Sequence, residues 1–189
     1  MSSPASVRMT ADEFIVWALA QPECEHYELV DGEVIATAPE RSMHARAKGH
    51  LYRRLADAVE KDYPHCEAFI DGLSVVIDQD TVYEPDVLVR CGERLGDAVV
   101  SISDPIIVIE VVSRASRGRD TAIKLTDYFR LPSIRHYLIV QAEARVIIHH
   151  ARQEDGTILT RIAGDEPIRL DPPGIVLSDP LPPATRDLH

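Results

Sequence analysis

The chain has 189 residues, of which 45% are hydrophobic and 27% charged, and its formal net charge is −11. This length fits one domain with a normal-sized core better than two small ones. No apolar run is long enough to cross a bilayer, and residues 1–8 lack the apolar segment of a signal peptide, so we expect a cytoplasmic protein with no membrane partner. Cys24, Cys66 and Cys91 are odd in number, widely spaced and outside any CxxC pattern, which indicates a reducing compartment and no zinc cluster.

Residues 10–62 are predicted to form a helix, a hairpin and a longer helix. Thr10-Ala-Asp-Glu13 is a capping box that begins a short helix, and Pro22 ends it. Asp31-Gly32 supplies a type I′ turn between the apolar-rich runs YELV and EVIATA. From Arg41 to about Asp62 apolar residues recur at helical spacing, so we expect an amphipathic helix there.

The rest of the chain is rich in strands. Three strand-like runs, CEAFI, LSVVID and VYEPDVLVR, precede PIIVIEVVS, whose near-continuous apolar character indicates a central strand buried on both faces. A helix is expected from Arg117 to Leu131, followed by the strands HYLIV, RVIIHH and TILTRIA. The tail from Leu170 is proline-rich and is predicted to be an irregular arm with one short strand at most. This order predicts one α/β (α+β) domain over residues 1–189, with short N-terminal and Pro-rich C-terminal arms.

Glu110 is unusual because it stands in the middle of the apolar run IIVIEVV. An isolated buried carboxylate is costly even after relaxation, so it is normally neutralised, paired or metal-bound. In a purely structural interpretation, Glu110 reaches solvent at the strand end or pairs with a core arginine. In a functional interpretation it binds a metal, and a second carboxylate in a similar setting favours that one.

Asp86, in YEPDVLV, is that second carboxylate. The proline before it lacks a ladder donor, which favours an edge strand or a bulge that re-aims the side chain. Two carboxylates on neighbouring strands, projecting to one face, form the oxygen-rich ligand set that Mg²⁺ or Mn²⁺ prefers. The Pro-Asp pair alone is a weak motif, and the Glu inside a later apolar strand makes it more specific.

Basic residues cluster in two places despite the acidic total, which by itself argues against a nucleic-acid partner. The segment from Arg41 to Arg54 holds five Lys and Arg residues and no acid, and Arg114, Arg117 and Arg119 follow the Glu110 run. Local positive surface on an acidic body is compatible with a phosphate substrate, although a charge run is usually a solvated helix face.

The succession of motifs resembles the Uma-type family of predicted restriction endonucleases, formerly a domain of unknown function. In the family's order, from about Thr10 to Ala163, the matching signatures are YELVDGEV, a histidine at the start of a helix, EPDVLV, IVIEVVSRAS, the helix from Lys124 to Tyr128 and RHYLIV. The resemblance implies the PD-(D/E)xK nuclease superfamily and a restriction-endonuclease-like fold, in which helices flank a mixed central sheet. It also implies that Asp86 and Glu110 bind the metal.

The lysine of the PD-(D/E)xK motif is absent from its usual position. These nucleases have a lysine two residues beyond the glutamate to position or activate the attacking water, and here that residue is Val112. In the Uma-type family a lysine on the following helix takes its place, and the matching residue is Lys124. Either its long stem brings the ammonium to the metal, or it forms a surface ion pair with Asp120, worth about a few tenths of a kcal/mol.

Further candidates follow from the resemblance. Glu28 in YELV matches a family glutamate, which implies a third metal-binding carboxylate; otherwise it is an exposed hairpin residue. His44 matches a family histidine and is expected to contact phosphate or accept a proton, unless it is merely solvated. His149 and His150 alternate faces of one strand, so they cannot both serve one metal. The remaining candidates for substrate binding are Ser113, Arg114 and Tyr128.

These residues predict a Mg²⁺- or Mn²⁺-dependent endonuclease that hydrolyses phosphodiester bonds, of DNA by family analogy. In this scheme Asp86, Glu110 and Glu28 hold the metal and Lys124 stabilises the developing charge. The alternative is a catalytically inactive nuclease-fold domain that binds nucleic acid or a protein partner, which Val112 and the acidic balance favour.

A third possibility is a small-molecule metallohydrolase, which predicts a deep, closed pocket over Glu110. An open groove flanked by arginines would instead indicate a polymeric substrate. A homodimer is expected as well, because many nucleases of this fold are dimers and exposed strand edges permit pairing.

Overall fold

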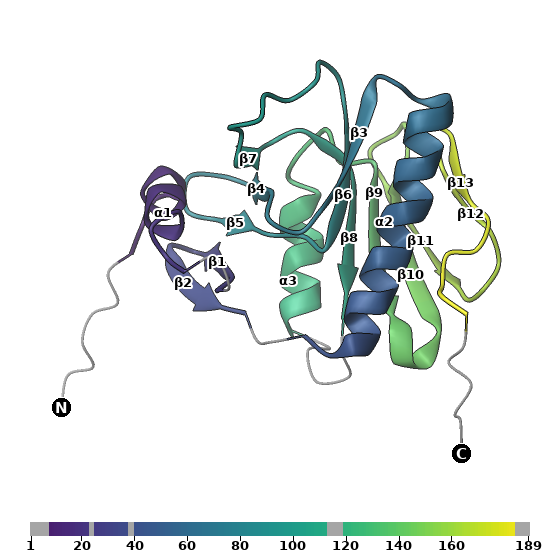
Figure 1. Ribbon diagram of the computed structural model, residues 1–189, viewed down its shortest axis with the longest axis horizontal. Helices are drawn as coiled ribbons and strands as arrows, with labels where there is room; N and C mark the ends of the chain where they lie inside the picture. Colours follow the sequence, from purple (N-terminus) through teal and green to yellow (C-terminus); the bar gives the residue numbers. More distant parts are fainter. Residues whose placement is uncertain (1–7, 23–24, 38–39, 113–118, 184–189) are drawn as a thin grey trace.

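The computed structural model describes residues 8–22, 25–37, 40–112 and 119–183 (Figure 1). No helix in these ranges is both long and apolar enough to cross a membrane. The described elements, in chain order, are α1 (Ala11–Ala18), β1 (Tyr27–Val30), β2 (Glu33–Ala36), α2 (Ser42–Asp62), β3 (Cys66–Ile70), β4 (Ser74–Val76), β5 (Val82–Tyr83), β6 (Val87–Cys91), β7 (Ser101–Ile102), β8 (Pro105–Val111), α3 (Arg119–Tyr128), β9 (His136–Gln141), the 3₁₀ turn η1 (Ala142–Ala144), β10 (Val146–Arg152), β11 (Ile158–Ala163), β12 (Ile168–Leu170) and β13 (Ile175–Leu177).

The first elements follow local signals in the sequence. The Thr10 hydroxyl accepts a hydrogen bond from the Glu13 backbone N–H, and the Glu13 carboxylate accepts one from the Thr10 N–H at 2.8 Å, so the predicted capping box is confirmed. Asp31 and Gly32 have φ values of 50° and 78°, the left-handed pair that a type I′ turn requires. The predicted hairpin of β1 and β2 and the predicted long helix α2 are both present.

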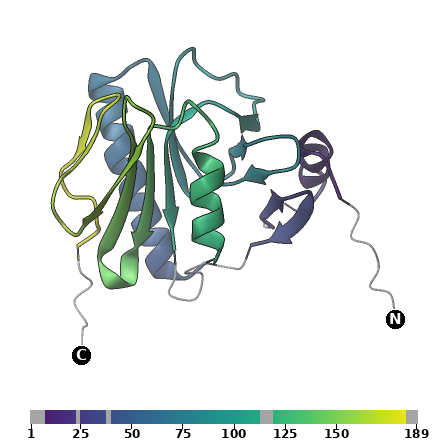
Figure 2. The ribbon, with the colours of Figure 1, turned by 180° about the vertical axis from the view of Figure 1, so that it is seen from behind.

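A six-stranded sheet forms the centre of the molecule, with strand order β11-β10-β9-β8-β6-β3. Only the β8–β9 pair is parallel, so the sheet is mixed. Helix α2 covers one face and α3 the other, which the front and back views show (Figures 1 and 2). Strand β8 lies inside the sheet between β6 and β9, as its near-continuous apolar sequence predicted.

Alternation along β8 decides where Glu110 points. Ile107 and Ile109 belong to the core cluster beneath α2, whereas Val108 belongs to the cluster on the α3 side. Because side chains of a strand alternate between faces, Glu110 projects to the α3 side with Val108. The carboxylate is therefore directed at a helix.

The run VYEPDVLVR is not one strand, which corrects the expectation from its sequence. Val82–Tyr83 form β5 in a second sheet, of order β2-β1-β5-β4-β7, and Val87–Cys91 form β6 in the six-stranded sheet. The chain passes from one sheet to the other at Glu84-Pro85-Asp86, where proline has no N–H to continue a ladder. The β6 strand is also interior and not an edge strand, so Asp86 lies at the junction of the two sheets.

The C-terminal tail holds the one short strand that was allowed for it, β13, but it is packed and not a free arm. With β12, this strand forms a hairpin whose residues Ile168, Leu170, Ile175 and Leu177 join the core cluster under α2. In each strand the first and third residues are buried and the middle one is exposed. The short runs IRL and IVL have this alternation in their sequence, but the prolines near them favoured an irregular segment instead.

Cys66 and Cys91 form a disulfide with a Cα–Cα distance of 3.9 Å. The two residues are direct partners in the antiparallel β3–β6 pair, although 25 residues separate them in sequence. Their spacing outside any CxxC pattern did not indicate this pairing. The bond uses both sulfurs, whereas the cysteine pattern had indicated a reducing compartment, in which disulfides are rare.

The C-terminal hairpin provides a test of its place in the core. Leu177 is 1% exposed and the neighbouring Val176 is 49% exposed. We expect Leu177→Ala to lower the free energy of unfolding by about 2–5 kcal/mol, because it leaves a cavity under α2. Val176→Ala, as the matched control, should change it by about 0.5 kcal/mol or less. Urea denaturation measures both, and equal effects would contradict the packing described.

Candidate active site

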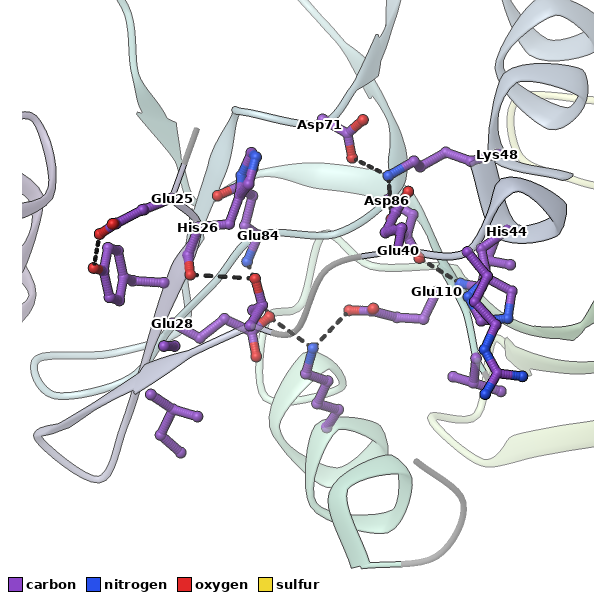
Figure 3. Close-up of a pocket in the computed structure, with 18 of the residues that line it drawn as sticks. Glu25, His26, Glu28, Glu40, His44, Lys48, Asp71, Glu84, Asp86 and Glu110 are labelled. Atoms are coloured by element: carbon purple, nitrogen blue, oxygen red, sulfur yellow. Dashed lines mark hydrogen bonds and ion pairs between the residues drawn. The ribbon is translucent and has the colours of Figure 1, made fainter. Parts of the chain in front are cut away.

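A half-open pocket of about 1080 Å³ lies where β1, α2, the end of β8 and α3 meet (Figure 3). Its described lining is strongly acidic. The basic and imidazole side chains that line it are Arg41, Lys48, Lys124, His26 and His44. Seven carboxylates line it: Glu25, Glu28, Glu40, Asp71, Glu84, Asp86 and Glu110.

Asp86 and Glu110 are brought together by the pairing of β6 with β8. Val87 is opposite Ile109 in this antiparallel pair, so Asp86, one residue earlier, comes opposite Glu110, one residue later. The Val111 backbone N–H donates to Asp86 Oδ2 at 2.5 Å, which fixes the orientation of the carboxylate. The two carboxylates that the sequence singled out, Asp86 just before β6 and Glu110 on β8, therefore lie opposite each other in one site.

Lys124 enters the site from α3. Its ammonium is buried and lies 2.7 Å from Glu28 Oε1 and 3.2 Å from Glu110 Oε1. Of the two alternatives for this lysine, the structure has the one that brings the ammonium to the carboxylates. The Val112 position faces the same side as Glu110, but its side chain packs against the apolar cluster that contains Tyr128.

Tyr128 lies behind Glu110, one helical turn after Lys124. It is fully buried, and its hydroxyl donates to Glu110 Oε1 at 2.7 Å. Burial raises the pKa of Tyr128 well above its ordinary value, and the charges of Glu110 and Glu28 raise it further, so the hydroxyl remains a donor. Tyr128 is not among the pocket-lining residues, so this position orients Glu110 and does not present the ring to a substrate.

Lys48, on α2, is a site residue that the sequence did not single out. It forms ion pairs with Asp71 at 2.7 Å, with Asp86 at 3.4 Å and with Glu40. Burial acts to lower the pKa of Lys48, but the hydrogen bonds to Asp71 and Glu40 and the charge of Asp86 raise it overall, so the ammonium stays charged. One signal was available: Lys48 follows His44 by one helical turn and so shares its face.

Two carboxylates of the site hold protons unusually strongly. Burial raises the pKa of Asp86 to about 7, and the neighbouring charge of Glu110 raises it as well. Burial also raises the pKa of Glu28 to about 7, although the charge of Lys124 acts to lower it. Perturbed pKa values of this kind cluster at functional sites, because burial of like charges is otherwise selected against.

The other predicted site residues have different positions. His44 is buried beside the pocket, and its Nε2 has no hydrogen-bond partner among the described residues. Ser113 and Arg114 lie outside the described residues. His149 forms a hydrogen bond with His136 and His150 one with Thr160, and neither residue lines the pocket.

The sequence model of the Uma2 family, described as "Putative restriction endonuclease", matches residues 11–179. The chain belongs to this family. The resemblance inferred from the motifs is therefore confirmed. Among its relatives are two uncharacterized proteins of Synechocystis sp.: one is 24% identical over 162 residues, covering 83% of this chain and 89% of the relative, and the other is 27% identical over 150 residues, covering 79% and 77%.

One solved structure also resembles this Uma2-family chain. It is titled "a putative nuclease belonging to DUF820" from Anabaena variabilis, and it superposes with a TM-score of 0.64 at 17% identity, covering 85% of this chain and 88% of that one. At this identity the likeness shows a shared fold. It confirms the predicted α+β, restriction-endonuclease-like class, in which helices flank a mixed central sheet.

The donor set of the Uma2-family site fits a hard divalent cation. Asp86, Glu110 and Glu28 line one pocket and offer carboxylate oxygens, which Mg²⁺ and Mn²⁺ prefer, and the buried Nε2 of His44, without a hydrogen-bond partner among the described residues, also lines it. Of the described pocket carboxylates, Glu40, Asp71 and Asp86 are the ones with oxygens within 4.8 Å of one another. Arginines do not flank the described part of the pocket as expected of a polymer groove, since only Arg41 lines it. The described lining carries seven carboxylates against three Lys and Arg side chains.

The raised pKa values predict how stability depends on pH when no metal is present. For Asp86 and Glu28 the folded-state pKa of about 7 lies above the ordinary values of 3.8 and 4.5. Between about pH 4 and pH 7 the folded state therefore keeps protons that the unfolded state has released, so the free energy of unfolding falls as the pH rises through this window. Urea denaturation at pH 5 and pH 8 in EDTA measures this fall. The Glu28→Gln/Asp86→Asn variant should show a smaller fall, and an unchanged fall would contradict the assignment.

Proposed function

We propose that this protein is a divalent-metal-dependent endonuclease that hydrolyses phosphodiester bonds, with Mg²⁺ or Mn²⁺ as cofactor and DNA as substrate. The observation that carries the proposal is the meeting of Glu28 from β1 and Glu110 from β8 at the Lys124 ammonium, with Asp86 opposite Glu110 just before β6. Carboxylates gathered against their mutual repulsion are the signature of a cation site. The choice of DNA rests on the family description alone.

In this proposal Asp86, Glu110 and Glu28 hold the metal ion. When bound, the ion lowers the pKa of a water molecule and neutralises charge on the phosphate. Asp86 is held for this task by the Val111 N–H, and Glu110 by the Tyr128 hydroxyl. These second contacts keep both carboxylates oriented towards the pocket.

Lys124 takes the role of the motif lysine that Val112 replaces. Its ammonium reaches Glu110 from α3 and not from the strand that carries Glu110. A fixed cation at this place stabilises the negative charge that develops on the phosphate oxygens, or orients the attacking water. His44 supports the same step as a contact for phosphate or as a proton acceptor, since its buried Nε2 is unpartnered among the described residues.

The rival function is a nuclease-fold domain without catalysis that binds nucleic acid or a protein. The acidic lining favours its protein-binding form, because the seven described carboxylates of the pocket repel a phosphate backbone when no cation intervenes. Val112 favours this rival as well, whereas the Lys124 ammonium at Glu110 favours the nuclease.

A homodimer is also part of the proposal. Ile158, Leu159 and Ile162 are exposed on β11, which lies at the edge of the six-stranded sheet. An apolar edge strand of this kind is a surface for pairing with a second copy. Sedimentation of the purified protein, compared with an Ile162→Lys variant, measures the expected dimer.

Metal binding separates the nuclease from its rival. We expect Mn²⁺ to bind the unmodified protein in calorimetry, and Asp86→Asn and Glu110→Gln each to weaken binding and to lower nuclease activity on the order of 10³-fold or more. Asp97→Asn, at an exposed position outside the pocket, is the matched control and should change neither. Failure of the unmodified protein to bind Mn²⁺ would sink the proposal.

Lys124 is tested separately from the metal. We expect Lys124→Met to lower kcat by about 10²–10³-fold, because it removes a fixed charge that acts in the transition state. Mn²⁺ binding should persist or become tighter, since a competing cation has left Glu28 and Glu110. Nuclease kinetics and calorimetry measure the two effects, and unchanged kcat would assign Lys124 to structure alone.

A further inference from the structure

Two buried lysines flank the Asp86–Glu110 pair from opposite sides. Lys124 reaches Glu110 from α3, and Lys48 reaches Asp86 from α2. In Figure 3 the Lys48 side chain extends from its helix to a position between Asp71 and Asp86, where Glu40 also points. The proposed mechanism uses the first lysine and leaves the second without a role.

The surroundings of Lys48 have the composition of a cation site. One oxygen each of Glu40, Asp71 and Asp86 lies within 4.8 Å of the other two. Three carboxylates so close repel one another unless a cation stands among them, although water screens part of the charge of Glu40 and Asp71, whose side chains are 38% and 42% exposed. Here that cation is the ammonium of Lys48, whose side chain is 9% exposed.

The ammonium is directed at these carboxylates. It donates hydrogen bonds to Asp71, at 2.7 Å, and to Glu40, and it forms an ion pair with Asp86 at 3.4 Å. Two of the three N–H donors of a lysine are thus used by Glu40 and Asp71. The charge of Lys48 therefore acts directly on Asp86.

Asp86 is the carboxylate that links the two halves of the site. Its Oδ2 accepts from the Val111 N–H, and its Oδ1 is the oxygen nearest to Lys48. Sites with two metal ions place them about 3.5–4 Å apart with a carboxylate between them. Glu40, Asp71 and Asp86 surround a second such position, and a side chain of the protein fills it.

We propose that Lys48 is a built-in cation standing where a second divalent ion would bind, so that the active site takes one metal ion and not two. The inference rests on the proposed function only in taking Asp86 as a ligand of that single ion. Lys48 is thus a positioning residue: it holds Asp86 and offsets the charge of Glu40 and Asp71. Its position on a rigid helix makes the second cation permanent and independent of metal concentration.

The number of Mn²⁺ ions bound per chain, measured by calorimetry on the full-length protein, tests this. We expect one ion for the unmodified protein and two for Lys48→Met, which keeps the length of the side chain but removes its charge. The matched control, Lys48→Met/Glu40→Gln/Asp71→Asn, lacks the vacated carboxylates and should return to one ion.

Two results would overturn the inference. In the first, the unmodified protein binds two ions, which means that metal displaces Lys48. In the second, Lys48→Met binds no more ions than the unmodified protein, which means that the carboxylates around Lys48 are not a cation site.

Lys48→Met is expected to be less stable without metal, because three carboxylates then lose their counter-charge. Thermal unfolding at increasing Mn²⁺ concentration still tests the inference in this variant. An ion that binds the vacated carboxylates must raise the Tm of Lys48→Met more steeply than the Tm of the triple variant.

The same measurement separates this inference from the proposed function. An unmodified protein that binds no Mn²⁺ contradicts the metal-dependent nuclease. If Lys48→Met then gains one ion, the built-in cation is upheld while the nuclease is not. If Lys48→Met also binds none, both are overturned.

Discussion

The burial of Glu110 in the central strand is the constraint on which the site depends. A carboxylate among apolar side chains is tolerated only where other groups compensate for its lost hydration. Here an ammonium and a phenolic hydroxyl, from Lys124 and Tyr128, both reach the same oxygen of Glu110. Both groups come from α3, so that helix has to pack over the end of β8 with its Lys124–Tyr128 face towards the sheet.

A break in the chain between two sheets supplies the second carboxylate. Pro85 cannot continue a β-ladder, so the chain leaves the five-stranded sheet there and enters the six-stranded one at Val87. Asp86 is the residue at the crossing. One oxygen of its side chain accepts a hydrogen bond from the Val111 N–H, and the other forms the ion pair with Lys48. The topology thus places a polar residue at the rim of an apolar sheet.

The site carries more negative charge than the fold alone would favour. Raised pKa values of about 7 at Asp86 and Glu28 mean that ionisation of these groups works against the folded state. Two lysines offset part of that charge, and the proposed metal ion offsets more. A binding or catalytic site needs such a charged, pre-arranged pocket even though the pocket lowers the stability of the folded protein. In a purely structural core, apolar side chains at these positions would be more stabilising.

Sequence alone determined the features that are encoded within a few neighbouring residues. The Thr10 cap, the Asp31-Gly32 turn, the α2 helix and the buried β8 strand follow from capping chemistry, positive φ and periodicity, which need no distant partner. The anomaly of Glu110 was visible for the same reason, since its apolar neighbours adjoin it in the chain.

Only the tertiary structure decided which distant residues meet. Lys124 lies 96 residues from Glu28, and the choice between a site lysine and a surface ion pair depended on that contact. The roles of Asp71 and Lys48, the Cys66–Cys91 bond and the buried C-terminal hairpin were hidden equally. Each depends on how helices and strands pack against one another. The chemistry of a single residue does not specify which distant residue will become its partner in the folded protein.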